Sequence, residues 1–325
     1  MLAPDFWDGK DICSRLVVAA LSPIGWIYGF VVALQSKRMV PFRAPVPVVC
    51  VGNLTAGGTG KTPIAAALFR RLKARGKNPF FLTRGYGGKL SGPIRVTASH
   101  RAVDVGDEAL LLLAAGPVVV AHDRAAGARL AVADGADVIV MDDGYQNFTL
   151  HKDLSLVVVD AAQKFGNGRL LPAGPLREFV RFGLKRADGV IVAGKGEGEV
   201  DLKGFKGPVM RVRLTHADMP QLKGTKVVGF AGIGRPEKFF ASLEECGADI
   251  VARKRFSDHH VYSHAEIARL KAMARERDAL LVTTRKDYVR LTRSSREGLT
   301  VLPATAVFGD PAAMDALLDK LVEPA

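Results

Sequence analysis

Cysteine and aromatic residues are scarce in this sequence. The three cysteines, Cys13, Cys50 and Cys246, are odd in number, lie far apart and form no CxxC or Cys/His spacing. The pattern therefore indicates neither a disulfide framework nor a zinc site, and it favours a reducing compartment. Aromatic residues make up only 7% of the chain, and no helix-turn-helix or RNA-recognition signature is present. These two features argue against nucleic acid as a partner.

The sequence also lacks internal repeats and low-complexity tracts, and acidic residues are fewer than basic ones. A hydrophobic share of 48% with 24% charged residues excludes a disordered or collagen-like chain. With 325 residues, the chain is long enough for two domains. Its formal charge of +13 favours an anionic partner, such as nucleic acid, an acidic membrane surface or a phosphorylated substrate. Charge alone does not choose among them.

One apolar run, residues 16–34, carries no charge. As a helix it would extend about 28 Å, enough to span a membrane. Pro23 and Gly25 lie in its middle, so two short helices with a bend are expected, attached to a membrane peripherally or monotopically. The alternative is a buried helical hairpin. Basic residues that can hold anionic head groups follow the run at Lys37, Arg38 and Arg43.

From residue 45 onward, apolar strand patterns alternate with helical ones. Strands are expected at 46–52, 80–83, 118–121, 138–141, 154–160 and 189–193, and helices at 61–76, 107–115 and 123–134. Such Val/Ile-rich strands separated by helices predict an α/β fold with a mostly parallel sheet that is covered on both faces.

A glycine-rich and charged stretch at 194–208 marks a boundary or a surface connection. A second α/β unit is predicted after it. Its strands are expected at 226–234, 248–256, 279–284 and 300–308, and its helices at 236–246, 264–277 and 311–321.

The segment "TAGGTGKT" at 55–62 matches the phosphate-loop pattern G-x-x-x-x-G-K-[ST] at every position except the first. Glycines here let backbone N–H groups turn toward phosphate oxygens at the start of a helix. Lys61 is predicted to reach the β- and γ-phosphates, and the Thr62 hydroxyl to bind Mg²⁺. A purely structural turn is the alternative, but strand, loop, Lys-Thr and helix follow in the required order.

Four carboxylates lie where a phosphate-loop enzyme would use them. The strand "VIVM" at 138–141 leads into Asp142 and Asp143, the position of a Walker-B carboxylate that holds magnesium. Asp107 and Glu108 begin a predicted helix. Each pair has a simpler interpretation as a turn or helix cap. Beside a phosphate loop, however, a carboxylate at 107 or 108 can accept the proton of an attacking hydroxyl.

Two further segments carry functional candidates. "FSDHHVYSH" at 256–264 contains three histidines in no recognised metal spacing, so a histidine that orients a carboxylate, or an ordinary solvated loop, is favoured over zinc. Residues 164–186 interleave apolar residues with six basic ones against one acid, Glu178. This stretch can bind phosphate and contact acyl chains, although a solvated basic helix would look similar.

Seven segments, in this order, resemble the tetraacyldisaccharide 4'-kinases, the lipid A 4'-kinases of Gram-negative bacteria. They are "GNLTAGGTGKTP", "LTRGYGG", "GDEALLL", "DDGYQN", "LLPAGPLRE", "FAGIGRPEKFF" and "FSDHHVY". The resemblance runs from about residue 20 to about residue 292. Threonine is usual at the first loop position in this family, so Thr55 is a family trait rather than a defect.

The resemblance implies ATP-dependent transfer of the γ-phosphoryl group to the 4'-hydroxyl of a tetraacyldisaccharide 1-phosphate, giving lipid IVA. Asp107, His259 and Lys61 match the family's catalytic residues. The residues implied to bind ATP are Thr55, Ala56, Gly57, Gly58, Thr59, Gly60, Lys61 and Thr62. Those implied to bind Mg²⁺ are Thr62, Asp142, Asp143 and Glu108, and those near the substrate are Arg84, Arg124, Gln146, Arg177 and Glu178. Arg285 departs from the family, which more often has glutamate there.

The family's organisation implies three parts in this chain. Residues 1–43 are expected to form an apolar membrane-associated segment, 44–207 the phosphate-loop kinase core, and 208–325 a smaller α/β domain with two linker strands, matched to 208–214 and 300–308. A monomer is expected at the cytoplasmic face of the inner membrane. Two alternatives remain: a phosphate-loop ATPase of the metallochaperone or partitioning type, which hydrolyses ATP without a lipid acceptor, and a basic peripheral binding protein.

Overall fold

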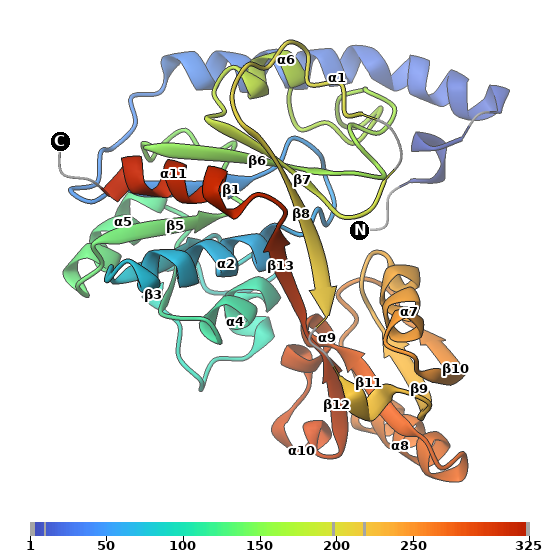
Figure 1. Cartoon of the computed structure of the whole chain (residues 1–325). Coiled ribbons are helices and arrows are strands. Elements are labelled where there is room, and N and C mark those ends of the chain that lie inside the picture. The colour runs from blue at the N-terminus through green and yellow to red at the C-terminus, as the bar shows by residue number, and fades with distance from the viewer. Residues whose placement is uncertain (1–3, 10, 197–198, 217–218, 323–325) are drawn as a thin grey trace.

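The computed structural model describes residues 4–9, 11–196, 199–216 and 219–322, and these form two sheets. The larger sheet has the order β13-β8-β7-β6-β1-β5-β2-β4-β3 (Figure 1). Its strands are β1 (Val48–Gly52), β2 (Pro79–Thr83), β3 (Ile94–Arg95), β4 (Val118–Val120), β5 (Val138–Asp142), β6 (Leu154–Asp160), β7 (Gly189–Ala193), β8 (Val209–His216) and β13 (Ala304–Phe308).

The larger sheet is parallel apart from its edge strands β3 and β13. Its central strand β1 pairs in parallel with β5 on one side and β6 on the other, and every residue of the three strands is buried. Such strands are rich in valine and isoleucine because both faces of the sheet are covered. The predicted α/β class with a mostly parallel core sheet is confirmed.

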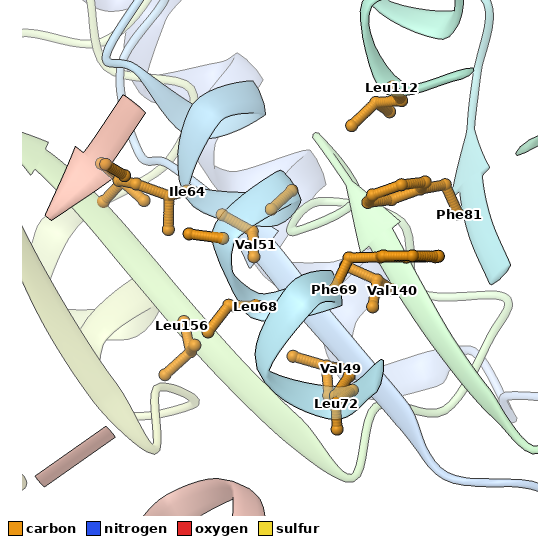
Figure 2. Close-up of a cluster of buried hydrophobic side chains, with 14 of the residues drawn as sticks. Val49, Val51, Ile64, Leu68, Phe69, Leu72, Phe81, Leu112, Val140 and Leu156 are labelled. Atoms are coloured by element: carbon orange, nitrogen blue, oxygen red, sulfur yellow. The ribbon is translucent and has the colours of Figure 1, made fainter. Parts of the chain in front are cut away.

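Helices cover both faces of this sheet. One face packs against α2 (Lys61–Ala74), α4 (Asp107–Leu113) and α11 (Pro311–Val322), with the short α3 (Ala102–Val105) preceding α4. Figure 2 shows this cluster, in which Ile64, Leu68 and Leu72 of α2 lie over Val49 and Val51 of β1. The other face packs against α5 (Arg124–Ala133) and α6 (Val180–Leu184).

The apolar N-terminal run forms one continuous helix, α1 (Ile12–Arg38), after a short 3-10 helix, η1 (Asp5–Trp7). The prediction of two short helices is wrong, as is the buried hairpin. Pro23 lies inside the helix, which is held against the larger unit at two glycines. A Cβ on Gly25 would lie 3.0 Å from the Leu170 carbonyl oxygen, and one on Gly29 only 2.6 Å from Leu170 Cδ1. The helix thus continues past the proline and packs closely on Leu170.

Most of α1 faces away from the protein. Only 22% of its apolar window is buried, and it is the one helix within the described residues that is long and apolar enough to cross a membrane. Its exposed large apolar side chains include Ile12, Leu16, Ile24, Trp26, Ile27 and Phe30. Figure 1 shows α1 running along the edge of the larger unit farthest from the smaller one.

The smaller unit is a parallel sheet of order β10-β9-β11-β12. Its strands are β9 (Lys226–Ala231), β10 (Asp249–Arg255), β11 (Leu280–Thr284) and β12 (Leu299–Leu302). Its helices are η2 (Pro220–Leu222), α7 (Pro236–Glu245), α8 (His264–Glu276), α9 (Arg285–Arg290) and α10 (Arg293–Arg296). The chain leaves β9 toward β10 on one side, while β11 lies on the other, so a switch point falls at the carboxyl ends of β9 and β11.

The segment 300–308, expected to be one strand, is divided between the two sheets. β12 ends at Leu302, and β13 begins at Ala304 and pairs antiparallel with β8 of the larger sheet. Pro303 separates them, because proline has no N–H to continue a ladder. β8 and β13 are therefore the two strands through which the chain enters and leaves the smaller unit, as Figure 1 shows.

The C-terminal helix α11 returns to the larger unit. Arg71 Nη1 lies 2.6 Å from Asp315 Oδ1, and Arg75 Nε lies 2.7 Å from Asp319 Oδ1, so α11 is ion-paired to α2. The smaller unit is thus held between two strands that both belong to the larger sheet. Its switch point and the carboxyl end of β1 face the same space between the units, where the functional residues gather.

Candidate active site

The phosphate-loop segment connects β1 to α2. Gly60 has φ +81° immediately before the first residue of α2, and Gly57 has φ +105°, values that favour glycine. A Cβ built on Gly57 or Gly58 would meet no protein atom within 4 Å, so the outer side of the loop is open. Backbone N–H groups at such a helix start form a site for phosphate oxygens.

The loop is fixed from its inner side by Asn53, which the sequence analysis did not single out. Asn53 Nδ2 donates to the Thr55 carbonyl oxygen at 2.7 Å and lies 3.3 Å from Thr59 Oγ1. Thr55 is itself buried and forms an isolated bridge with Leu176. This arrangement explains why the first loop position needs no glycine: it packs against the protein rather than facing the open side.

Lys61 and Thr62, the first residues of α2, each meet an aspartate at the end of β5. Thr62 Oγ1 donates to Asp142 Oδ2 at 3.0 Å, and Lys61 Nζ lies 3.3 Å from Asp143 Oδ1. Arg177 Nη1 also donates to Asp143 Oδ1, at 2.9 Å. The structure therefore brings together the two loop side chains, both aspartates and Arg177, which was expected near the substrate.

The two aspartates differ in their charge environment. Burial, together with the negative charge of Asp143, raises the pKa of Asp142 to about 7. Burial acts on Asp143 as well, but the positive charges of Lys61 and Arg177 outweigh it and lower the pKa of Asp143 to about 2. Within the described part of the chain Asp142 forms no ion pair, whereas Asp143 forms two.

This difference bears on which residues fit Mg²⁺. Asp142 Oδ1 and Glu108 Oε2 are buried and accept no hydrogen bond from any described residue. Glu108 lies near enough to Asp142 for its charge to raise that residue's pKa. Carboxylate oxygens without donors, beside a threonine hydroxyl, are the ligands that Mg²⁺ prefers. Thr62, Asp142 and Glu108 thus fit the ion, while Asp143 is occupied by Lys61 and Arg177. No cluster of three His, Cys, Asp or Glu side chains suited to a metal occurs among the described residues.

Asp107, the first residue of α4, contacts the smaller unit. His259 Nδ1 lies 2.9 Å from Asp107 Oδ2, and Arg290 Nε donates to the same oxygen at 2.7 Å. Burial would raise the pKa of Asp107, but the hydrogen bonds from His259 and Arg290 outweigh it and lower the pKa below its ordinary value. The carboxylate is therefore ionised near neutral pH and joins the two units.

Of the three histidines at 256–264, only His259 reaches this site. It has φ +59°, and its own N–H donates to Asp258 Oδ1. His260 lies 3.1 Å from Glu266, and His264 lies 3.4 Å from Ser295 Oγ. The loop conformation thus separates the adjacent pair, as expected for neighbouring side chains, and places one ring against the carboxylate.

The sequence analysis missed two basic residues of α9 that contact the site. Lys286 Nζ lies 3.4 Å from Glu108 Oε1 and 3.3 Å from His259 Nε2, and Arg290 contacts Asp107 as described. Both follow the apolar strand pattern at 279–284. Because ligand sites in α/β folds lie beyond the carboxyl ends of strands, basic residues at this place could have indicated a role in the site. Arg285, the position that departs from the family, is exposed.

The residues expected near the substrate differ in exposure and in the partners that they contact. Arg84 is exposed, and Arg124 is buried, where burial and the charge of Arg84 lower its pKa to about 10. Gln146 Nε2 donates to Glu178 Oε1 at 2.9 Å, and Arg186 pairs with the other oxygen of Glu178 at 2.6 Å. Glu178 is therefore buried and fully engaged within the protein, so its nearest contacts are structural.

Comparisons with known proteins identify the family of this chain. The family model described as tetraacyldisaccharide-1-P 4'-kinase matches residues 17–323. Tetraacyldisaccharide 4'-kinases from Paramagnetospirillum magneticum and Rhodospirillum centenum are 49% and 48% identical, each over 99% of this chain and over 99% and 97% of their own lengths. The crystal structure of LpxK from Aquifex aeolicus in complex with ATP is similar with a TM-score of 0.78 and 25% identity, covering 94% of this chain and all of that one.

Proposed function

Because the chain belongs to the tetraacyldisaccharide 4'-kinase family, we propose how its residues carry out that reaction. The protein is a kinase that transfers the γ-phosphoryl group of ATP to the 4'-hydroxyl of tetraacyldisaccharide 1-phosphate in lipid A biosynthesis, giving lipid IVA. A phosphate-loop ATPase with water as acceptor is not favoured, since the match to lipid kinases extends over nearly the whole chain.

ATP binds with its phosphates on the open side of the loop at 55–62. The backbone N–H groups there and the start of α2 hold the phosphate oxygens, and Lys61 exchanges its contact with Asp143 for the transferring phosphoryl group. Thr62, Asp142 and Glu108 would hold Mg²⁺, which when bound would neutralise negative charge on the phosphates. Arg177 keeps Asp143 paired when Lys61 turns to the ligand.

Asp107 is the general base. All of its described contacts from the smaller unit go to Oδ2, which leaves Oδ1 to accept the proton of the sugar hydroxyl. His259 orients the carboxylate. The Asp107–His259 contact carries this proposal, because it joins an ionised carboxylate of one unit to a histidine of the other, beside the phosphate loop. Positioning of the hydroxyl against the phosphate then supplies most of the acceleration.

The lipid acceptor is approached from the membrane side of the molecule. The exposed apolar side chains of α1 and the basic residues after it favour peripheral or monotopic attachment at the cytoplasmic face of the inner membrane, where the protein acts as a monomer. A cavity of about 360 Å³ has Phe165, Leu176, Phe179 and Val180 in its wall, and Arg181, Asp201 and Lys203 also line it. Phe179 packs against Gly29 of α1. Because Lys203 is paired with Asp201, Arg181 is the lining cation left for an anionic lipid, and the apolar wall suits acyl chains.

The test is a direct transfer assay. Purified protein is incubated with ATP labelled in its γ-phosphate and with detergent-dispersed tetraacyldisaccharide 1-phosphate. Label in the lipid, dependent on Mg²⁺, is the expected result. Label released only as inorganic phosphate, at a rate that does not depend on the lipid, would indicate a hydrolase instead.

A further inference from the structure

We propose that Arg290 is a positioning residue of the kinase reaction, which aims the Asp107 carboxylate at the acceptor hydroxyl when the two units are together. The inference rests on the proposed role of Asp107 as base. It adds a second donor, from a helix that the motif analysis did not connect with catalysis.

The contact geometry supports an orienting role. Arg290 Nε donates to Asp107 Oδ2 at 2.7 Å, and its Nη2 lies 2.6 Å from the same oxygen. With His259 Nδ1 at 2.9 Å, three nitrogen atoms surround one carboxylate oxygen. Of the two guanidinium nitrogens, Nε donates a hydrogen bond, whereas Nη2 adds a nearby positive charge without one. The terminal torsion of an aspartate is otherwise broad, so the hydrogen bonds from Arg290 Nε and His259 Nδ1 decide which oxygen faces outward. The rigid planar guanidinium fixes that choice more firmly than a lysine ammonium would.

Arg290 is itself held by the smaller unit. Its Nη1 donates to the Gly232 carbonyl oxygen at 2.7 Å and to Asp287 Oδ1 at 3.0 Å, and the side chain is only 4% exposed. Asp287 is fully buried. Its carboxylate accepts hydrogen bonds from the Gly232 N–H, the Tyr262 hydroxyl and the Thr284 hydroxyl. The guanidinium is thus held by residues at the carboxyl ends of β9 and β11, independently of its contact with Asp107.

Only one of these contacts crosses between the units. Gly232 and Asp287 lie on the smaller unit, whereas Asp107 begins α4 of the larger one. The contact of the second donor, His259, with Asp107 also crosses between the units. Separation of the two units would therefore remove both donors from Asp107 at once, while Arg290 would keep its own support. Arg290 couples the approach of the two units to the orientation of the base.

A double-mutant cycle separates this role from a purely structural ion pair. The full-length chain is compared as wild type, Arg290→Met, Asp107→Asn and the double variant, with Arg290→Lys as the conservative replacement. We expect Arg290→Met to lower kcat about 10- to 100-fold with an unchanged KM for ATP, and Arg290→Lys to recover part of that loss. Because Arg290 acts through Asp107, the double variant should turn over no more slowly than Asp107→Asn alone.

The controls keep the outcomes distinct. Arg293→Met, at an exposed arginine of α10, should leave kcat unchanged. Normal turnover in Arg290→Met, or multiplied losses in the double variant, would overturn the inference while leaving Asp107 as base. Full turnover in Asp107→Asn would instead refute the base itself. If Arg290→Met loses its cooperative thermal transition, the cycle is run with Arg290→Lys instead. We then expect Arg290→Lys to lower kcat in the wild-type background but not in the Asp107→Asn background. Losses that add in the two backgrounds would count against the proposal.

Discussion

The Thr62 hydroxyl donates to Asp142 Oδ2 at 3.0 Å, which joins the first turn of α2 to the last residue of β5. The other oxygen of Asp142 is buried without a donor. A hydroxyl and a carboxylate oxygen are thus already placed side by side where a nucleotide-bound cation would sit, and burial of the carboxylate is costly until a cation arrives.

The first prediction concerns this pair. Thr62→Val removes the hydroxyl but keeps the side-chain volume, so the concentration of Mg²⁺ needed for half-maximal kinase rate should rise. Thr62→Ser, the matched control, should behave almost as the wild type. The measurement is a Mg²⁺ titration of lipid phosphorylation, and chelation of the metal should abolish activity in all three proteins. Identical titration curves for the valine and serine variants would remove Thr62 from metal binding.

The second prediction concerns Lys61. Lys61→Met keeps the aliphatic stem and removes the charge, so kcat should fall about 10²- to 10³-fold, as when one donor to a developing charge is lost. Loss of the partner also leaves Asp143 with Arg177 alone, which should preserve the fold. Lys73→Met, at an exposed position on the same helix, is the control and should have wild-type rates. Undiminished labelling of lipid by Lys61→Met would contradict the assignment of the loop.

The third prediction concerns an ion pair between the units. Asp160, at the end of β6, accepts from Lys238 Nζ of α7 at 2.9 Å and lies 3.4 Å from Arg235 Nη1. Burial would raise the pKa of Asp160, but the hydrogen bond from Lys238 and the charge of Arg235 lower it overall. A carboxylate with a lowered pKa in the folded state stabilises the fold above its unfolded-state pKa of about 4, and this contribution disappears as pH falls through the folded-state value.

Asp160→Asn should therefore lower the melting temperature at pH 7, corresponding to a loss of about 1 to 2 kcal/mol. The difference from wild type should shrink as the pH is brought below 4. Thermal unfolding followed by circular dichroism at several pH values measures this. Asp249→Asn, at an exposed aspartate of β10, is the control without such partners. A difference that stays constant from pH 7 to pH 3 would show that the charge of Asp160 is not responsible.

The fourth prediction concerns the exposed face of α1. Ile27 is 66% exposed and Phe30 is also 66% exposed. If this face enters the lipid interface, replacing either with glutamate should weaken binding to vesicles about tenfold or more, since burial of such a side chain contributes about 1.5 to 3 kcal/mol. Co-sedimentation with vesicles that contain anionic lipid is the measurement. Gln35→Glu, an exposed polar site on the same helix, controls for the added charge and should bind nearly as the wild type.

Local patterns predicted most of the α/β core, because a buried parallel strand and an amphipathic helix each produce a recognisable pattern within a short stretch of sequence. β6, β7 and the start of α2 lie where the patterns placed them. The errors arose where tertiary contacts decide. Pro23 does not interrupt α1, which packs closely on Leu170 at two glycines, and no local signal reports that contact.

In the site, too, some features followed from local sequence patterns and others depended on tertiary contacts. The loop at 55–62 and Asp142 lie next to each other in space because adjacent parallel strands end at one edge, so their proximity followed from the sequence. Arg290 could not be assigned in that way. It reaches Asp107 from 183 residues away in the chain, and its direction is set by Asp287 and Gly232, which only the folded smaller unit brings together.

The return of β13 and α11 to the larger sheet has a consequence for biosynthesis. During translation α1 leaves the ribosome first, whereas the strand that borders β8 and the helix that covers α2 are made last. The nucleotide-handling half of the enzyme therefore stays incomplete at one edge until residues 304–322 have been synthesised. Under the proposed membrane attachment, the nascent chain would contact a lipid surface through α1 before it is able to phosphorylate anything there.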